Sequence, residues 1–193
     1  MKVRGLGLSA KKPYFKDRRS AIISIAVVAF LLVLAVLAID RNNVRRLSRY
    51  HEQAFSSQEI VGYQLSQRFG YAATLASLLD ERGQREPLLA ITTAFETAQT
   101  IAEQSTLYRE LETELAALQK ELFAEPAYNQ YAPYFDKMYE IEGELVTSIA
   151  AYNERAEFYN RQIHAFPASI VAKRLALDEL AFYSVSSALK SRP

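Results

Sequence analysis

The residues of this sequence that could carry acid–base or metal chemistry are few and scattered. The chain of 193 residues has two histidines, His51 and His164, and no cysteine. Without cysteine there is no thiol nucleophile, no thiolate metal site and no disulfide bond. The sequence also lacks a glycine-rich phosphate loop, a nucleophile elbow and a zinc-protease motif. We therefore predict no catalytic, cofactor-binding or metal-binding residues, and we expect the protein not to be an enzyme.

The two histidines are predicted to lie far apart. We treat the helices predicted below as antiparallel rods joined at their ends. His51 then lies near the end of the bundle that follows the hydrophobic N-terminal run, called the membrane end below, and His164 lies near the far end. About twenty-four residues of helical rise, ~36 Å, then separate them. One metal ion could not bind both side chains at that distance.

One carboxylate, Glu142, falls on a helical row whose other members are apolar. A charged side chain in such a row needs a partner or an altered protonation state. We expect Glu142 to fix the register of the helices or to reach the surface, and a functional polar pocket is the alternative. In the rod picture it lies level with about residue 53. The candidate partners are then His51, Arg49, Arg109 and Lys120.

Arg68 is a second charged residue in an apolar row, seven residues after Val61 and seven before Leu75. The rod picture places it too far along the bundle to reach Glu142. Arg68 would instead meet Glu154 or Glu157. With Glu142 and Arg68, the residues predicted to have a structural or interaction role are Tyr152, Asn153, Tyr159, Asn160, Phe166 and Pro167.

A hydrophobic run, Ala21–Ile39, precedes the residues discussed so far and has one polar member, Ser24. At ~1.5 Å per residue its nineteen residues span ~28 Å, close to the hydrocarbon thickness of a bilayer. We predict a transmembrane helix. A buried core helix and a cleaved signal peptide are the alternatives, but the run exceeds the usual ~7–15 residues of a signal-peptide core.

Charge favours one orientation of this helix. Seven Lys or Arg residues lie in the basic N-terminal arm, residues 1–20, and four arginines follow the run within twenty residues. The positive-inside rule then places the N-terminus in the cytoplasm and the domain outside, in a single-pass membrane protein. Residues 40–193 hold sixteen Lys or Arg against twenty-one Asp or Glu. This acidic balance argues against nucleic-acid binding.

The rest of the chain is predicted to be helical, because glycine and proline are scarce and apolar residues recur every seven. The fold class is all-α, an antiparallel bundle of three long helices and a short C-terminal helix, over residues 40–183. Residues 184–193 form a tail. The expected helices run from the membrane to about Leu79, from Pro87 to about Phe123, from about Phe135 to the stop at Pro167, and from Ala168 to about Leu175.

The third of these helices carries the clearest pattern. Two rows at spacing seven form a seam of more than four heptads. We expect their aromatic residues to pack in the core, although such seams could also pair two chains into a homo-oligomer. The rows are Phe135, Glu142, Ile149, Ala156 and Ile163, and Met138, Leu145, Tyr152, Tyr159 and Phe166.

Two asparagines, Asn153 and Asn160, lie side by side on a flank of the same helix. We predict that they hydrogen-bond the segment that folds back after Pro167, and a partner-binding strip is the alternative. A tyrosine-rich turn, Tyr128–Tyr134, precedes the helix. The rod picture places this turn near the membrane end, where tyrosine favours the lipid interface.

These motifs together resemble the C-terminal signature of the LemA family. That signature has two Tyr-Asn pairs seven residues apart, then Phe-Pro, an apolar run and an aromatic pair. Here they are Tyr152-Asn153, Tyr159-Asn160, Phe166-Pro167, Ile170-Val171-Ala172 and Phe182-Tyr183. Glu142 and Arg68 match a glutamate and an arginine of the family. Two departures are Ile149, where the family has arginine, and Ala72-Ala73-Thr74-Leu75, where it has Ile-Pro-Asn-Leu.

The resemblance implies a membrane-anchored helical bundle that works as a scaffold or adaptor in bacterial membranes, without catalytic residues. Some members of the family keep this domain in the cytoplasm, which conflicts with the charge rule. We predict a scaffold that presents an interaction surface to an unidentified membrane or envelope protein. The alternative is a membrane-tethered sensor that binds a small ligand. It would need converging polar residues, and Glu142, Arg68 and His51 are not all predicted to converge.

Overall fold

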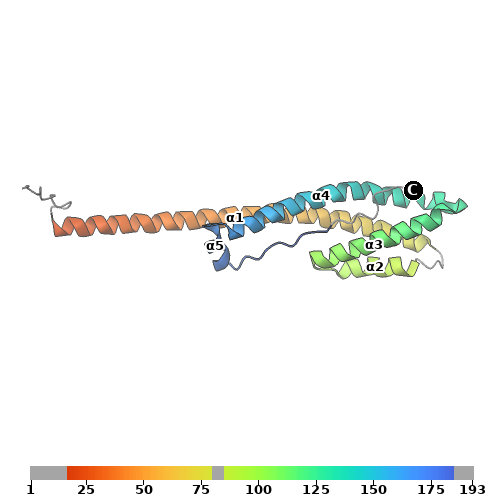
Figure 1. Cartoon of the computed structure of the whole chain (residues 1–193), viewed down its shortest axis with the longest axis horizontal. Coiled ribbons are helices and arrows are strands. Elements are labelled where there is room, and N and C mark those ends of the chain that lie inside the picture. Colours follow the sequence, from red (N-terminus) through yellow and green to blue (C-terminus); the bar gives the residue numbers. More distant parts are fainter. Residues whose placement is uncertain (1–16, 80–84, 185–193) are drawn as a thin grey trace, which may run out of the picture. The chain divides into compact units, whose positions relative to one another are not determined.

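The computed structural model of the chain describes residues 17–79 and 85–184, and none of these residues lies in a β-strand. The prediction of an all-α chain with an antiparallel bundle is confirmed. The basic arm and the C-terminal tail lie almost entirely outside the described residues. The helices are α1 (Arg18–Leu78), α2 (Arg85–Thr97), α3 (Ile101–Phe123), the 3-10 helix η1 (Pro126–Gln130), α4 (Ala132–His164) and α5 (Ala168–Arg174) (Figure 1).

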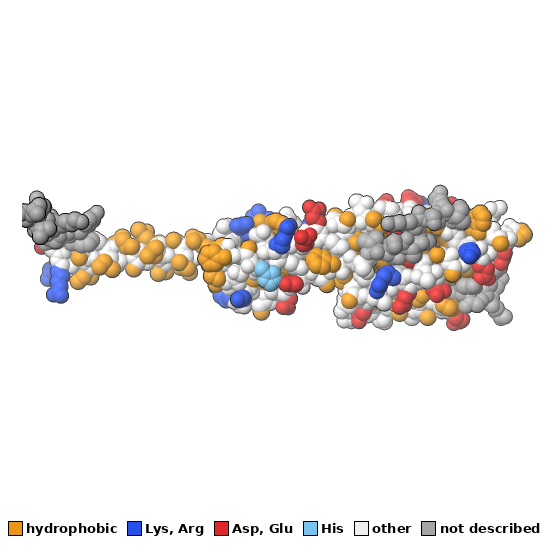
Figure 2. Space-filling view, viewed as in Figure 1, with side chains coloured by type: hydrophobic (Ala, Val, Ile, Leu, Met, Phe, Trp, Pro, Cys, Tyr) orange, Lys and Arg blue, Asp and Glu red, His pale blue; other side chains and the backbone are white. Residues whose placement is uncertain are grey.

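The chain divides into two compact units, Met1–Asn43 and Val44–Pro193. The described part of the first unit is the start of α1, which is covered by exposed apolar side chains (Figure 2). Among the described residues, α1 is the helix long and apolar enough to cross a membrane. The apolar run that meets this test is the one predicted from the sequence to be an anchor.

The second unit is held by apolar rows that its long helices bury. The α1 row at spacing seven is buried throughout, including Arg68, and so are the α4 rows except for Glu142 and Phe166. Phe166 is 83 % exposed, because α4 ends at His164 and the chain turns before Phe166 could complete its row. The heptad pattern therefore predicts the core of the bundle correctly, apart from the end of α4.

The predicted helix from Pro87 to Phe123 is two helices. α2 ends at Thr97 and α3 begins at Ile101, after the cap residue Thr100. The Thr100 hydroxyl accepts a hydrogen bond from the Glu103 N–H at 3.2 Å, and the Glu103 carboxylate accepts one from the Thr100 N–H at 3.0 Å. This capping box satisfies N–H groups that a helix start leaves unpaired. The hydrogen bond from the Thr100 backbone also lowers the pKa of the Glu103 carboxyl.

The break reverses the chain, so that α2 and α3 pack as a hairpin. α2 lies on α1 through stacked rings of Phe69 and Phe95, with centroids 3.8 Å apart. α3 returns to the end of the unit where α1 ends, and α4 then runs antiparallel to α1. Partners on α1 and α4 follow this direction: Tyr50 with Phe158, Ser57 with Arg155, and Gln64 with Glu144.

The reversal overturns two placements made with unbroken rods. The tyrosine-rich turn packs with the Leu79 end of the unit rather than the Val44 end, and Tyr131 is buried in the main core cluster. The histidines are not at opposite ends either. The His51 ring lies edge-on to Tyr159, with centroids 5.5 Å apart, and Tyr159 precedes His164 by five residues on α4.

The capping box can be tested with Thr100→Ala. Loss of the cap should lower the free energy of unfolding by about 1 kcal/mol, within a range of roughly 0.5–2. Thermal unfolding of the full chain in mild detergent, followed by circular dichroism, measures the change. Thr106→Ala is the matched control, because Thr106 is exposed inside α3 and alanine is the better helix former there. Equal losses in both variants would contradict a special role for Thr100.

Candidate functional site

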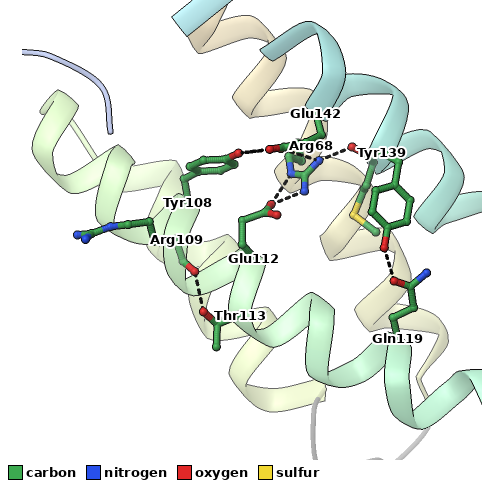
Figure 3. Close-up of polar contacts among 9 residues, drawn as sticks. Arg68, Tyr108, Arg109, Glu112, Thr113, Gln119, Tyr139 and Glu142 are labelled. Atoms are coloured by element: carbon green, nitrogen blue, oxygen red, sulfur yellow. Dashed lines mark hydrogen bonds and ion pairs between the residues drawn. The ribbon is translucent and has the colours of Figure 1, made fainter. Parts of the chain in front are cut away.

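A buried arginine organises the polar interior of the second unit. The Arg68 side chain of α1 is fully buried among apolar residues, where an unpaired charge would be costly. Its Nε donates to Glu112 Oε1 at 2.8 Å, Nη2 makes a second hydrogen bond to the same oxygen, and Nη1 donates to the Met138 carbonyl (Figure 3). Glu112 lies on α3 and Met138 on α4, so the guanidinium joins three helices.

Glu142 completes this cluster. Its Oε2 lies 3.2 Å from Arg68 Nη1, and its two oxygens accept the Tyr108 hydroxyl at 2.6 and 2.7 Å. The prediction that Arg68 is too far away to reach Glu142 is wrong. The cause is the reversal between α2 and α3, which places the start of α4 beside the end of α1. Glu142 does meet partners on other helices, but they are Arg68 and Tyr108 in place of the predicted His51, Arg49, Arg109 and Lys120. The predicted pairing of Arg68 with Glu154 or Glu157 is wrong for the same reason.

The charges of the cluster do not balance unless one carboxyl holds a proton. One guanidinium lies between two carboxyl groups, and Glu112 Oε2 is buried without a hydrogen-bond partner. Burial raises the pKa of Glu112 from an ordinary 4.5 to about 7, because desolvation outweighs the attraction of Arg68. Burial and the bond to Glu142 also raise the pKa of Tyr108, which stays a phenol and donates its proton. Glu112 is therefore the group that titrates near neutral pH.

Glu112 and Tyr108 were not singled out from the sequence as polar partners. A signal for Glu112 exists, because it lies four residues after Tyr108 and next to Leu111, on the face that α3 buries. An acid inside an apolar stripe is the same signal that identified Glu142. A neighbouring polar layer has Gln119 between two tyrosines: Tyr139 donates to its carbonyl and its amide donates to Tyr128 at 3.2 Å.

A second polar feature ties down an extended segment, residues 177–184. The Asn160 side chain donates to the Leu180 carbonyl at 2.9 Å and accepts from the Leu180 N–H at 2.8 Å. Asn153 makes the same pair of bonds to Tyr183, at 2.9 and 3.0 Å. The prediction that both asparagines bind the segment that folds back after Pro167 is confirmed.

The spacing of these two contacts matches on both sides. Seven residues of α4 separate Asn153 from Asn160, which is ~10.5 Å of helical rise. Three residues separate Leu180 from Tyr183, which is ~10 Å of extended chain. The two asparagine side chains, two helical turns apart, are thus spaced to meet two residues of the extended segment that are three positions apart. Each amide serves one backbone N–H and one carbonyl that would otherwise lack a protein partner.

Tyrosines complete the binding of this segment. Tyr152 donates to the Ala181 carbonyl at 2.7 Å, and the Tyr183 ring lies edge-on to Tyr152 with centroids 5.3 Å apart. The Tyr183 hydroxyl donates to Gln104 of α3 at 2.8 Å, and burial raises the pKa of Tyr183 to about 12. The segment therefore bridges α3 and α4. Phe182 of the predicted aromatic pair points outward and is half exposed.

The predicted residues thus fall into three places. Arg68 and Glu142 share the buried cluster, whereas the residues from Tyr152 to Asn160 lie along α4. Phe166 and Pro167 form the corner between α4 and α5. His51 lies elsewhere, in a groove of about 280 Å³ whose lining includes Leu47, Tyr159 and Leu177 but neither Arg68 nor Glu142. Within residues 17–79 and 85–184, no three His, Asp or Glu side chains are grouped so that they could hold a metal ion.

No protein-family model matches this chain, and no curated protein matches its sequence. The resemblance to the LemA family therefore stays a prediction.

The proton on Glu112 makes a pH prediction. Between pH 4.5 and about 7 the folded chain holds a proton on Glu112 that the unfolded chain has released. The free energy of unfolding should therefore fall as pH rises through this window and level off above it. Glu112→Gln, a neutral isostere, should remove this component of the slope. Chemical unfolding of the full chain in detergent at several pH values measures it.

The exposed Glu110 of the same helix provides the control, since Glu110→Gln should keep the slope of the unsubstituted chain. A slope that survives in Glu112→Gln would mean that Glu112 is ionised in the folded state throughout this range.

The asparagine contacts make a second prediction for this site. Replacing both Asn153 and Asn160 by Asp removes two donors and sets carboxylates against the carbonyls of Leu180 and Tyr183. Each change should cost about 1–3 kcal/mol. Hydrogen exchange at the Leu180 and Tyr183 amides should become much faster, while the exposed Asn129→Asp leaves it unchanged. Unchanged protection in the double variant would show that the segment is held by other contacts.

Proposed function

We propose that this protein is a membrane-anchored helical-bundle scaffold that presents an interaction surface to another protein at a bacterial membrane, without catalysis. The observation that carries the proposal is that the buried polar groups bind one another. Arg68, Glu112, Glu142 and Tyr108 are joined across three helices. Such a cluster stabilises a unique bundle, and it leaves the outer faces of the helices as the surface for recognition.

The anchor in this proposal is the exposed apolar run of α1. Its length and composition suit a bilayer, and flanking charge favours a cytoplasmic N-terminus with the domain outside. The resemblance to the LemA family supports the bacterial membrane and the adaptor role. The partner in this proposal is a membrane or envelope protein. A second copy of this chain is the other partner that the heptad seams allow.

The outer face of α1 within the second unit offers a surface for that partner. Phe55, Ile60 and Tyr63 are each at least half exposed there. Ile60 and Tyr63, three residues apart, share one face of the helix. Exposed apolar side chains that share a face are typical of surfaces that bind other proteins. A small-ligand sensor is the second candidate, favoured by the groove that His51 lines. The two candidates can be distinguished by mutation. Changes on the outer face of α1 should impair a scaffold, whereas changes in the groove should impair a sensor.

The scaffold proposal can be tested in cells, because the chain has no cysteine of its own. We would place one cysteine at Ile60 and label intact cells with a membrane-impermeant maleimide that carries a photoreactive group. Irradiation should give one discrete crosslinked product, because a scaffold holds a defined partner on this face. Thr113→Cys, at an exposed position of α3, is the control and should label equally without that product.

Three results would change the proposal in different ways. Labelling only after lysis would place the domain in the cytoplasm and reject the orientation. A product of twice the chain mass would show that the face pairs two copies. The absence of any discrete product from Phe55, Ile60 and Tyr63, on either side of the membrane, would reject this face as the scaffold surface.

A further inference from the structure

The charges of the second unit are unevenly distributed along the chain. Two segments lie at the end of the unit where it begins: residues 44–50 of α1, and residues 161–177, which run from the end of α4 through α5. Together they hold six Lys or Arg residues and no Asp or Glu. The remainder of Val44–Pro193 holds nine Lys or Arg against twenty Asp or Glu. We call these two segments the basic end. Acidic side chains border these basic segments: Glu157 pairs with Arg161 at 3.8 Å and Glu179 with His164 at 2.6 Å. In Figure 2 Lys and Arg side chains gather there, with Asp and Glu side chains beside them.

The two segments are joined by a small apolar cluster. Leu47 of α1 packs with Tyr159 and Ile163 of α4 and with the buried face of α5. That face consists of Ala168, Val171 and Ala172. Because these contacts bury one side of α5, the opposite side is presented outward at a fixed position on the bundle.

The outward side of the corner and of α5 is apolar as well as basic. Phe166 is 83 % exposed and Ile170 is 61 % exposed, and Lys173 and Arg174 lie one turn further on. Single exposed apolar side chains are common on soluble proteins, so it is their position beside Lys and Arg, at the corner and on the same short helix, that is informative. Apolar side chains beside Lys and Arg are the composition of segments that lie in a membrane interface.

The chain itself keeps the basic end close to the proposed anchor. Leu47, on which α5 packs, follows Ile39 at the end of the apolar run by eight residues. Whatever angle the two units adopt, eight residues can separate these points by no more than ~29 Å. A surface patch tethered this closely to a bilayer meets lipid headgroups at a high effective concentration.

We propose that the basic end lies on an anionic phospholipid surface. Phe166 and Ile170 enter the headgroup layer, and the exposed Lys173, Arg45 and Arg49 meet the lipid phosphates. The acidic remainder of the unit is repelled by the same surface, which orients the bundle with this end toward the membrane. The inference rests on the anchoring role proposed above for the apolar run, and it adds a second, reversible contact with the bilayer.

The test uses single cysteines in the full chain, each carrying a nitroxide spin label, in lipid nanodiscs. Ile170→Cys reports on the basic end, Val33→Cys on the anchor and Thr113→Cys on the acidic remainder of the unit. Collision with oxygen, which enters lipid, is compared with collision with a nickel chelate, which stays in water. The discs contain either phosphatidylglycerol or phosphatidylcholine.

In phosphatidylglycerol discs the Ile170 label should be shielded from the nickel chelate and accessible to oxygen. The shielding should weaken in phosphatidylcholine and at ~1 M salt, where charge interactions are screened within ~3 Å. Lys173→Glu combined with Arg49→Glu should abolish the difference between the two lipids. Lys120→Glu, an exposed charge reversal elsewhere, should not. The Thr113 label should stay in water throughout.

Two outcomes separate this inference from the anchoring proposal. If the Val33 label lies in lipid and the Ile170 label behaves like Thr113 in phosphatidylglycerol, the basic end does not bind the surface and the anchor stands. If the Val33 label is exposed to water, the anchor fails. Shielding of the Ile170 label on added phosphatidylglycerol vesicles then decides the basic end by itself.

Discussion

The bundle depends on one requirement, that the buried guanidinium of Arg68 be hydrogen-bonded on every side. The partners that meet it come from two other helices, with Glu112 on α3 and Glu142 and the Met138 carbonyl on α4. A shift of either helix by one turn would move these oxygens by ~5.4 Å and leave the charge unpaired. Loss of a partner of a buried ion pair typically costs about 3–5 kcal/mol. The cluster therefore favours the observed register over one in which either helix is shifted.

The C-terminal segment solves a related problem by different means. An extended chain next to helices has no neighbouring strand to pair its N–H and carbonyl groups. Side-chain amides of Asn153 and Asn160 take the place of that strand at Leu180 and Tyr183. Because Tyr183 also reaches Gln104, the segment links the start of α3 to the middle of α4. The hairpin of α2 and α3 is thereby held to α4 through polar contacts at two levels, by the Arg68 cluster and by this segment.

The functional proposals follow from which polar side chains are buried and which are exposed. Inside the bundle, charges neutralise one another, and a proton on Glu112 completes the balance. Outside, Lys and Arg are concentrated in two segments at one end of the unit, and large apolar side chains are exposed on α1 and at the α4–α5 corner. The proposed scaffold role would use a rigid interior and a differentiated surface.

Three local features can be predicted from the sequence alone: the apolar run, the helical rows that are buried, and the asparagines that bind the returning chain. These depend on periodicity and on residue type, which are properties of short stretches. The pairing of Arg68 with Glu142 and Glu112 could not be predicted in this way. That pairing depends on the direction of every helix. A break of three residues, which ends at Thr100, reverses the direction of the chain between α2 and α3. Thr100 and Glu103 form a recognisable capping pattern in the sequence, but no glycine or proline lies beside it to mark a break in a predicted helix. A periodic apolar pattern is the same whichever way a helix runs in the bundle. The pairing of residues between helices therefore could not be predicted from periodicity.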